Sequence, residues 1–404
     1  MEEQTYENRP LETGNSFEDS PLMRVINQSL QGDRYVWLVV VALSLMSILV
    51  VYSATGTLAY KKMQGNTEYY LLKHGALVAL SLLVMWVAHQ IDYRYYAKLS
   101  RLALLASVPL LLISWRFGVN INEASRWITI PLINQSFQPS DLAKLALISH
   151  VAAMLARSQR NMQDFQQSIQ PVLIWIGVIC MLIGLSNISN ALLLFFICVV
   201  LMFIGRVPIQ YLLMLGLIGG IAVMMALMMG QRMETALSRV QKFTDTEEVH
   251  FQAQQSYIAI ATGGFLGKGP GNSDQRNFLP HPYSDFIYAI IIEEYGFVGG
   301  VMVLFLYLTL LYRGVMIAAN SRRVFGSLLA VGLTFSLVFQ ALLNMCVSVG
   351  LVPITGVPMP MLSMGGTSLL FTGLAIGILL SISRGELDPE IDQLARSSSA
   401  NTEE

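Results

Sequence analysis

The sequence predicts an all-α, polytopic membrane protein with about ten transmembrane helices and one large extracytoplasmic loop between the seventh and eighth helices. Three observations predict this class. Of the 404 residues, 54% are hydrophobic and only 13% are charged, whereas a soluble domain usually carries about 25% charged residues. The mean hydropathy is +0.55. Apolar segments of roughly 17 to 20 residues, the length that crosses a bilayer, recur along the chain.

Ten segments meet this length or approach it, and the third, fourth and sixth are the shortest. A long polar gap, residues 230–285, separates the seventh from the eighth, and a connection of that length is usually functional. Within it, Met233–Phe243 has the apolar spacing and basic residues of a helix lying on the membrane surface. The candidate spans are Tyr35–Ala54, Leu71–Ala88, Leu102–Trp115, Leu142–Ala156, Pro171–Leu185, Asn190–Ile204, Tyr211–Met229, Phe286–Tyr312, Phe325–Val349 and Leu362–Ile382.

The chain therefore divides into residues 1–33, a transmembrane domain over 34–384 and a tail over 385–404. The first segment lacks the apolar core of a signal peptide, so we expect two disordered cytoplasmic tails. An even number of spans puts both tails on one side. Basic residues in short loops favour the cytoplasmic side for the tails. The inner short loops then hold Arg94, Lys98, Arg101, Arg157, Arg160, Arg206, Arg313, Arg322 and Arg323, against Lys61, Lys62, Lys73, Arg116 and Arg126 outside.

Net charge and cysteine content exclude several classes. The formal net charge is −1, so the chain is not a generic binder of nucleic acid or another polyanion. All three cysteines lie in apolar runs, as buried hydrophobes do, and one would be left over from any pairing. The glycine-dense stretch 263–271 is no phosphate-binding loop, because Thr262 replaces the first glycine and Gly269 replaces the hydroxyl residue after Lys268. It is either a turn that lets backbone approach a ligand or a flexible return to the membrane.

Asp285 stands at the start of the eighth span, and Glu293 and Glu294 follow about 12 Å further along the same helix. An ionisable group in a bilayer costs about 2.5 to 3.5 kcal/mol or more, so such residues indicate a functional site. Asp285 could instead cap the helix, and the two glutamates could be structural partners of basic residues. We favour the functional interpretation because a capping residue alone would not require two buried carboxylates beneath it.

Two further motifs lie on the same side. Gln138-Pro139-Ser140-Asp141 opens the fourth span, and Lys144 follows Asp141 at a spacing that lets the two meet on one helix face. The alternative is an internal ion pair and nothing more. The second motif, 350–368, contains three prolines and several glycines between two spans, which predicts a rigid outer loop or merely a stiff connector.

Taken together, these motifs resemble the SEDS family, named for shape, elongation, division and sporulation. The resemblance rests on Pro280 to Gly296, with Gln255-Ser256, Arg126-Trp127, Asp141-x-x-Lys144 and Pro353 to Ser368 in the same order, and it covers about Tyr35 to Arg384. The tail and the segment 66–70 look more like the division branch. Asp141 stands where the family usually has glutamate, and the family's Gln-Pro-Asp-x-Gly stretch is absent near Asn187 to Asn190.

The resemblance implies a glycosyltransferase of the bacterial cytoplasmic membrane, at the division septum, that polymerises lipid II, an undecaprenyl-pyrophosphate disaccharide, on the outer face. It also implies a class B penicillin-binding protein as transpeptidase partner, together with other division proteins, and it places the catalytic aspartate at Asp285. Such a carboxylate can act as general base. Cations stabilise the pyrophosphate that leaves, and the candidates are Lys144, Arg126, Lys73, Arg232, Arg239 and Lys268.

Further substrate-binding candidates are Asp141, Gln255, Ser256, Glu293, Glu294, Ser363 and Thr367. A divalent cation such as Mg²⁺ or Mn²⁺ could share the neutralising role, although the sequence shows no ligand set for one. Two other functions fit part of the pattern. A flippase for lipid-linked sugars would explain ten helices with buried charges, but its polar site should lie near the bilayer midplane. A structural division scaffold would leave Asp285 and Lys144 unexplained.

Overall fold

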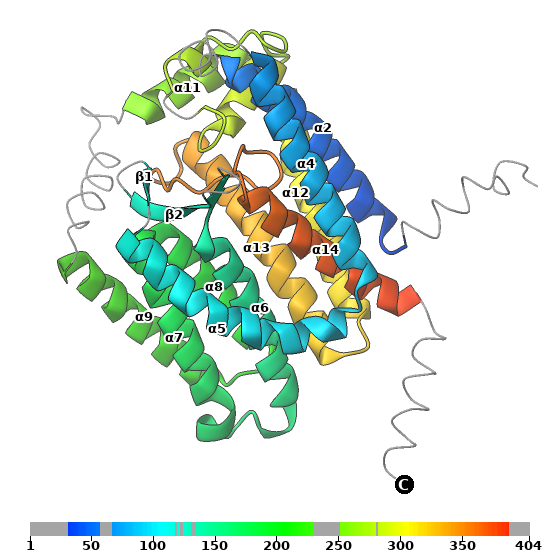
Figure 1. Cartoon of the computed structure of the whole chain (residues 1–404), viewed down its shortest axis with the longest axis vertical. Coiled ribbons are helices and arrows are strands. Elements are labelled where there is room, and N and C mark those ends of the chain that lie inside the picture. The colour runs from blue at the N-terminus through cyan, green and yellow to red at the C-terminus, as the bar shows by residue number, and fades with distance from the viewer. Residues whose placement is uncertain are drawn as a thin grey trace, which may run out of the picture.

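The computed structural model describes residues 31–56, 67–117, 119–121, 124–130, 135–229, 251–279 and 282–387. These residues form a bundle of long helices (Figure 1). The helices are α2 (Arg34–Ala54), α4 (Thr67–Gln90), α5 (Tyr93–Phe117), α6 (Pro139–Arg157), α7 (Gln170–Ser186), α8 (Ile188–Ile204), α9 (Ile209–Met229), α11 (Phe251–Gly263), α12 (Ile287–Asn320), α13 (Val324–Ser348) and α14 (Ser368–Leu387).

Seven helices in the described part of the chain are long and apolar enough to cross a membrane: α2, α4, α5, the helical segment Phe165–Gly184, α12, α13 and α14. Two shorter apolar helices, Ile188–Ile204 and Ile209–Gly220, follow the segment that contains α7. The predicted class, a polytopic helical membrane protein, is confirmed. Each of the ten expected spans coincides with a helix, but ten crossings remain a prediction, since α6 is not among the seven and α8 is short.

The largest differences from the predicted boundaries are in three helices. The third span begins at Tyr93 rather than Leu102, because tyrosines and basic residues extend the helix beyond its apolar part. The last span begins at Ser368 rather than Leu362, since Gly366 has a left-handed φ of 56° that ends the preceding turns. The eighth span, α12, continues to Asn320 and is interrupted at Gly296, where φ is 70° and ψ is −170°.

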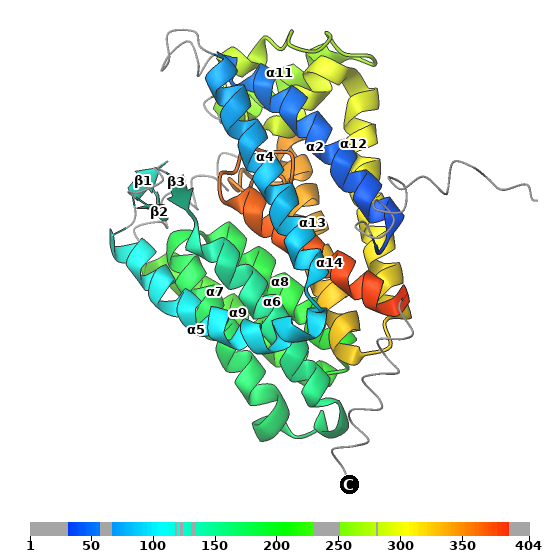
Figure 2. The ribbon, with the colours of Figure 1, turned by 45° about the vertical axis from the view of Figure 1, so that its right-hand side comes forward.

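The helices form two groups joined by α13. Figures 1 and 2 show α2, α4, α12 and α14 on one side of α13 and α5 to α9 on the other. Helix α13 packs against α12, α6, α8 and α14. The hydrophobic core follows these contacts, with Leu329, Val338 and Ala341 of α13 fully buried. Because α13 contacts both groups, its polar residues can reach segments from either one.

Polar connections gather at one end of the bundle. Here lie α11, the segment 349–367 between α13 and α14, and three short antiparallel strands in the order β1 (Val119–Ile121), β2 (Ala124–Ile130) and β3 (Gln135–Phe137) (Figures 1 and 2). We call this the polar end. At the opposite end, the N–H of Asp33 donates a hydrogen bond of 3.0 Å to Ser383 Oγ. The start of α2 and the end of α14 therefore meet away from the polar end.

Candidate functional site

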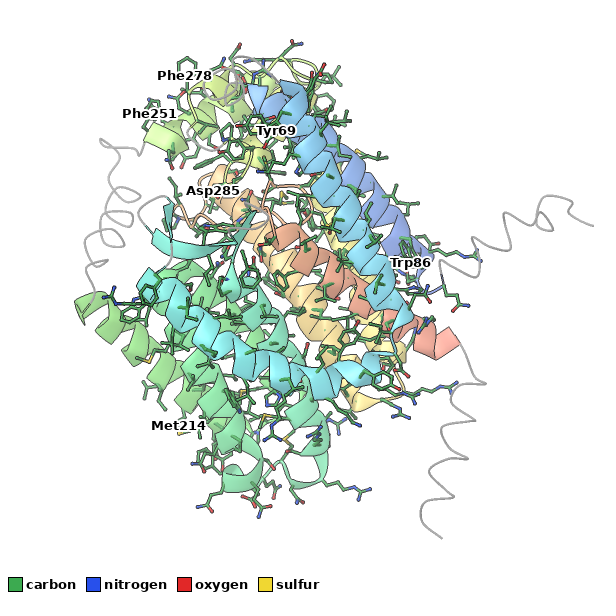
Figure 3. All side chains as sticks on the ribbon, viewed as in Figure 1. Tyr69, Trp86, Met214, Phe251, Phe278 and Asp285 are labelled. Atoms are coloured by element: carbon green, nitrogen blue, oxygen red, sulfur yellow. The ribbon has the colours of Figure 1, made fainter. Side chains whose placement is uncertain are left out.

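Asp285 lies in the turn that precedes α12, at the polar end (Figure 3). The helix begins at Ile287 and its N-cap position is held by Phe286, which makes no side-chain capping hydrogen bond. The alternative role of Asp285 as the cap of this helix is therefore wrong. The side chain is half-buried, and its Oδ1 accepts a hydrogen bond of 3.1 Å from Ser284 Oγ.

The connection between α13 and α14 covers Asp285 from one side. Gly356 has a φ of 64°, and a Cβ built on it would lie 3.8 Å from Asp285 Oδ2. Tyr283 packs near the same carboxylate. Burial raises the pKa of its phenol, and neighbouring Tyr70 and Asp285 raise that pKa further. Tyr283 therefore stays neutral beside Asp285 at physiological pH.

Ser363 joins this connection to the Asp285 segment. Its hydroxyl donates a hydrogen bond of 2.7 Å to the carbonyl of Ser284, and its Oγ accepts one of 2.8 Å from the N–H of Met359. Thr367, further along, accepts a 3.4 Å hydrogen bond at Oγ1 from the N–H of Gln138. The single segment 349–367 thus contacts both the Asp285 turn and the start of α6.

Asp141 and Lys144 form the ion pair that their spacing predicts. Lys144 Nζ lies 2.8 Å from Asp141 Oδ1, and the two residues are only 8% and 6% exposed, respectively. The other oxygen, Asp141 Oδ2, has no hydrogen-bond partner among the described residues. A buried pair with one unsatisfied oxygen has capacity left for another polar group.

A cavity between α6, α13 and α14 opens beside this pair. Its polar lining residues lie mostly toward the polar end of these helices, and its apolar ones lie one or two turns deeper. The cavity is therefore lined by charged side chains at one end and by apolar side chains further along. It is lined by Asp141, Lys144, Leu145, Ile148, Leu333, Ser336, Leu337, Gln340, Ser368, Phe371, Thr372 and Ala375.

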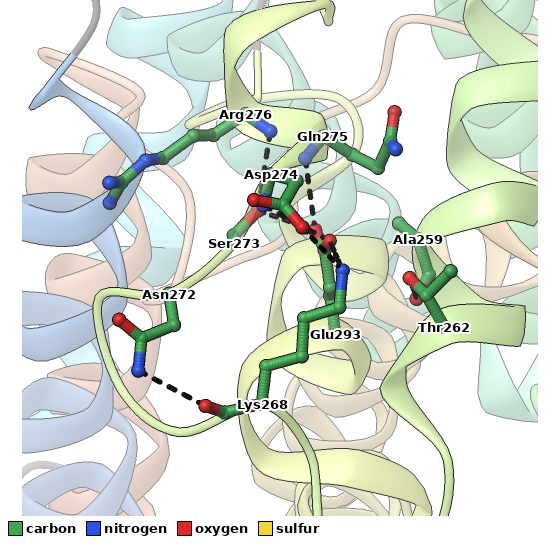
Figure 4. Close-up of polar contacts among 9 residues, drawn as sticks. All are labelled: Ala259, Thr262, Lys268, Asn272, Ser273, Asp274, Gln275, Arg276 and Glu293. Carbon is green, nitrogen blue, oxygen red and sulfur yellow. Dashed lines mark hydrogen bonds and ion pairs between the residues drawn. The ribbon is translucent and has the colours of Figure 1, made fainter.

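Glu293 and Lys268 are joined in a second cluster, above α12 (Figure 4). Glu293 is fully buried, and its Oε1 accepts from Lys268 Nζ at 2.7 Å and from the N–H of Asp274 at 3.1 Å. Its Oε2 accepts from Ser273 Oγ at 2.5 Å and from the N–H of Gln275 at 3.3 Å. These bonds hold the loop after α11 onto α12. They fit the alternative in which Glu293 is the structural partner of a basic residue.

The glycines of this loop permit direct backbone packing against the interruption of α12. A Cβ on Gly267 would lie 2.2 Å from the carbonyl oxygen of Glu294, and one on Gly296 would lie 2.3 Å from that of Phe265. Both glycines have left-handed φ values, 82° and 70°. Close backbone packing therefore accounts for Gly267 in the glycine-dense stretch, whereas a Cβ on Gly264 or Gly271 would have no described atom within 4 Å.

Glu294 contacts the end of α2. Its Oε1 accepts a hydrogen bond from Ser53 Oγ, and Arg276 Nη1 donates a hydrogen bond of 3.0 Å to the same hydroxyl oxygen. Glu294 is 1% exposed. It also accepts backbone hydrogen bonds from Gly271 and Ser273 of the loop after α11. Glu293 thus contacts that loop, whereas Glu294 contacts both the loop and α2.

The other predicted site residues are spread over the polar end. Ser256 donates from Oγ to the carbonyl of Ser348 at 2.9 Å, which ties α11 to the end of α13, and Gln255 is half-buried beside it. Lys73 is half-buried in the second turn of α4. For Arg126 the structure places the backbone, in β2. Arg232, Arg239 and the expected surface helix Met233–Phe243 lie outside the described residues.

A metal centre is not evident from the described side chains. No three or more of their His, Cys, Asp or Glu residues group closely enough to hold an ion. A role for a divalent cation stays a hypothesis.

Two polar residues of α13 were missed in the sequence. Asn344 donates from Nδ2 to the carbonyl of Asp285 at 3.0 Å and to that of Val357 at 2.8 Å. Gln340 donates from Nε2 to the carbonyl of Pro358 at 2.8 Å. The sequence does contain a signal for them, because Gln340, Asn344 and Ser348 recur every four residues and so share one face of an apolar span.

The fold and site define a polytopic helical membrane protein whose polar, charged site lies at one end of the bundle. The model of the FtsW/RodA/SpoVE family, described as cell cycle proteins, matches residues 33–387, and the chain belongs to this family. The expected SEDS membership, with FtsW-like character, is confirmed.

Curated relatives and solved structures agree with this assignment. A probable peptidoglycan glycosyltransferase FtsW of Geobacter sp. (strain M18) is 34% identical over 358 residues, 87% of this chain and 96% of the relative. Stage V sporulation protein E of Bacillus subtilis (strain 168) is 33% identical, covering 86% and 96%.

Among structures, a chain of a peptidoglycan synthase complex matches with a TM-score of 0.68 at 24% identity, covering 88% of this chain and 98% of that one. Thermus thermophilus RodA matches with a TM-score of 0.65 at 24% identity, covering 89% and 99%. At this identity the structural matches show a shared fold.

Proposed function

We propose that this chain is a peptidoglycan glycosyltransferase that polymerises lipid II into glycan strands at the outer face of the cytoplasmic membrane. One observation carries the proposal: the segment 349–367 contacts both the turn that holds Asp285 and the start of the helix that holds Asp141 and Lys144. The segment 349–367 contacts the Asp285 turn through Ser363 and the start of α6, three residues before Asp141, through Thr367. The names of the curated relatives support the same activity.

The reaction requires a sugar hydroxyl of one substrate to attack the anomeric carbon of another. A new glycosidic C–O bond forms, the bond from that carbon to the pyrophosphate breaks, and the hydroxyl proton must leave. Asp285 takes that proton as general base, a contribution typically worth about 10² to 10⁴ in rate. Its half-buried carboxylate at the polar end is accessible enough for this role.

Lys144 stabilises the negative charge that develops on the pyrophosphate. The cavity beside it has Asp141 and Lys144 at one end and Ile148 and Leu333 further along. In this proposal a phosphate group of the lipid-linked substrate meets the charged end. Asp141 keeps the ammonium group in place across 2.8 Å. The pair thus belongs to the substrate site in this proposal.

A flippase for lipid-linked sugars is the alternative of another class. Alternating access favours a polar site near the bilayer midplane. Here Asp285 lies in the turn before α12, and the Asp141–Lys144 pair lies in the first two turns of α6. This placement favours the polymerase.

The partners and location follow from the proposed activity. A class B penicillin-binding protein supplies the transpeptidase, and one structural relative belongs to a peptidoglycan synthase complex that coordinates polymerisation and crosslinking. We propose that both termini are cytoplasmic and that the protein acts at the division septum, with other division proteins.

The test is strand formation from purified lipid II in detergent, where transport has no meaning, with and without the transpeptidase partner. Asp285→Asn keeps the shape of the side chain and removes the proton acceptor. It should lower turnover by at least about 10², while binding of lipid II changes far less. Asp92→Asn serves as the matched control, since Asp92 caps α5 from its Oδ1 at the other end of the bundle and asparagine caps as well. Full activity of the purified Asp285→Asn protein would refute the proposal for Asp285.

A further inference from the structure

Three consecutive carbonyl groups in the turn before α12 are each held by a different donor. The carbonyl of Tyr283 accepts from the N–H of Met364 at 2.9 Å, and that of Ser284 accepts from Ser363 Oγ at 2.7 Å. The carbonyl of Asp285 accepts from Asn344 Nδ2 at 3.0 Å. No regular secondary structure holds this turn, so these donors fix its backbone.

The last two of these bonds flank the Cα of Asp285. The carbonyl of Ser284 belongs to the peptide plane before that Cα, and the carbonyl of Asp285 belongs to the plane after it. Since peptide groups are planar, fixing both planes fixes φ and ψ of Asp285 and therefore the direction of its Cα–Cβ bond. Ser363 and Asn344 together therefore determine the direction in which the Asp285 side chain leaves the backbone.

Asn344 is the donor that comes from a transmembrane helix. It lies on α13, is 1% exposed, and uses both amide hydrogens, on Asp285 and on Val357. Two carbonyl partners at one nitrogen also settle the orientation of the amide. Its Oδ1 has no hydrogen-bond partner among the described residues. A buried amide with an unsatisfied oxygen costs free energy. This cost indicates that the two hydrogen bonds donated by the amide nitrogen have a role of their own.

The same bridge sets the distance between Asp285 and the segment that covers it. Val357 follows Gly356, on which an added Cβ would lie 3.8 Å from Asp285 Oδ2. One turn earlier on α13, Gln340 holds the carbonyl of Pro358 and also lines the cavity beside Lys144. The polar face of α13 thus connects the Asp285 turn with the covering segment and with the cavity.

We propose that Asn344 is a positioning residue for the transfer reaction, which acts by holding the backbone of Asp285 against Val357. This inference rests on the proposed function. Asn344 does not exchange a proton with substrate; it keeps the carboxylate within reach of the hydroxyl that attacks. A displacement of about 1 Å at a reacting group can cost about 10² in rate.

The experiment compares Asn344→Leu with the unchanged protein in the lipid II polymerisation assay. Leucine has a similar size and branching but no donor. We expect kcat to fall by about tenfold to a hundredfold, KM for lipid II to change by less than about threefold, and the thermal transition to persist. Asn344→Asp provides a second variant of the same shape that also lacks the amide donor pair.

The control is Ser348→Ala, one turn further along the same face of α13. Its hydroxyl donates only to the carbonyl of Asn344 within the helix, so the variant should retain the wild-type kcat. Combination with Asp285→Asn tests the route of the effect. If Asn344 acts through Asp285, the double variant Asn344→Leu/Asp285→Asn should be no slower than Asp285→Asn alone.

Three outcomes would overturn the inference. Wild-type turnover in Asn344→Leu would show that the bridge is dispensable. An additive loss in the double variant would show that Asn344 acts elsewhere. Loss of the thermal transition in both Asn344 variants would make the residue part of the fold. Each of these differs from failure of the proposed function, which would appear as full activity of Asp285→Asn or as no strand formation by the wild type.

Discussion

Lys144→Met, compared with the double variant Asp141→Asn/Lys144→Met, tests whether the buried Asp141–Lys144 ion pair belongs to the substrate site or only holds the fold together. At 2.8 Å, a pair of unit charges attracts by about 6 kcal/mol at an effective dielectric constant of about 20. Desolvation offsets much of that attraction, yet removing one partner of a buried pair still costs about 3 to 5 kcal/mol, because the other charge is left uncompensated. We therefore expect Lys144→Met to lower both the thermal midpoint and strand formation.

The double variant Asp141→Asn/Lys144→Met separates the two effects. Removing both charges leaves no uncompensated charge, so the midpoint in detergent should return close to the wild-type value. Strand formation should remain at least about 10² below wild type, because one charged donor aimed at developing charge is worth about that much. Asp141→Asn alone reports what the carboxylate contributes when Lys144 is present.

The decisive assay is polymerisation of lipid II by the double variant at matched stability. Recovery of near wild-type strand formation together with stability would show that the pair only holds α6 in place. That result would remove Lys144 and Asp141 from the substrate site, and it would leave the assignment of Asp285 untouched.

Two further predictions concern the loop after α11. Gly296→Ala should lower the free energy of unfolding by more than about 3 kcal/mol, since φ is 70° and a Cβ would lie 2.3 Å from the carbonyl oxygen of Phe265. The control Gly264→Ala, where φ is 59° and no described atom lies within 4 Å of a Cβ, should cost only about 1 to 2 kcal/mol in the same thermal unfolding assay. A larger loss for Gly264→Ala than for Gly296→Ala would contradict the packing argument. Hydrogen bonds from Lys268 to Glu293 and to the adjoining loop raise the Lys268 pKa above its ordinary value of 10.5, so the stabilisation it provides should be complete below that pH and lost as pH rises through the raised pKa. Lys268→Met should remove this alkaline decline in thermal midpoint, which is expected above about pH 10.5, and an unchanged decline would assign it to another group.

The sequence predicts the helices and the ion pair well because both depend on local spacing. A run of apolar residues must bury its own backbone hydrogen bonds in lipid, so each expected span appears as a helix. Asp141 and Lys144 meet because residues three apart share a helix face. Helix ends are less certain, as at Ser368, because the left-handed backbone of Gly366 rather than hydropathy ends the preceding turns.

Contacts between distant segments were not predictable in this way. Asn344 lies 59 positions from Asp285 in the chain, and nothing in its local pattern says which backbone it will hold. The glycine-dense stretch is similar. Its left-handed residues could be expected from composition, but the close approach of Gly267 to the interruption of α12 depends on how α11 folds back.

Accessibility separates the three carboxylates that the sequence placed together on and before the eighth span. Glu293 is fully buried, and its oxygens already accept from Lys268 and Ser273. Glu294 is 1% exposed and bound to Ser53. A general base must reach its substrate and then hold a proton, and a buried carboxylate that already accepts hydrogen bonds within the fold cannot do so without disrupting them. Asp285 is half-buried, does not cap the helix, and has its backbone held from both sides, so the fold constrains its position while leaving its carboxylate within reach of a substrate at the polar end.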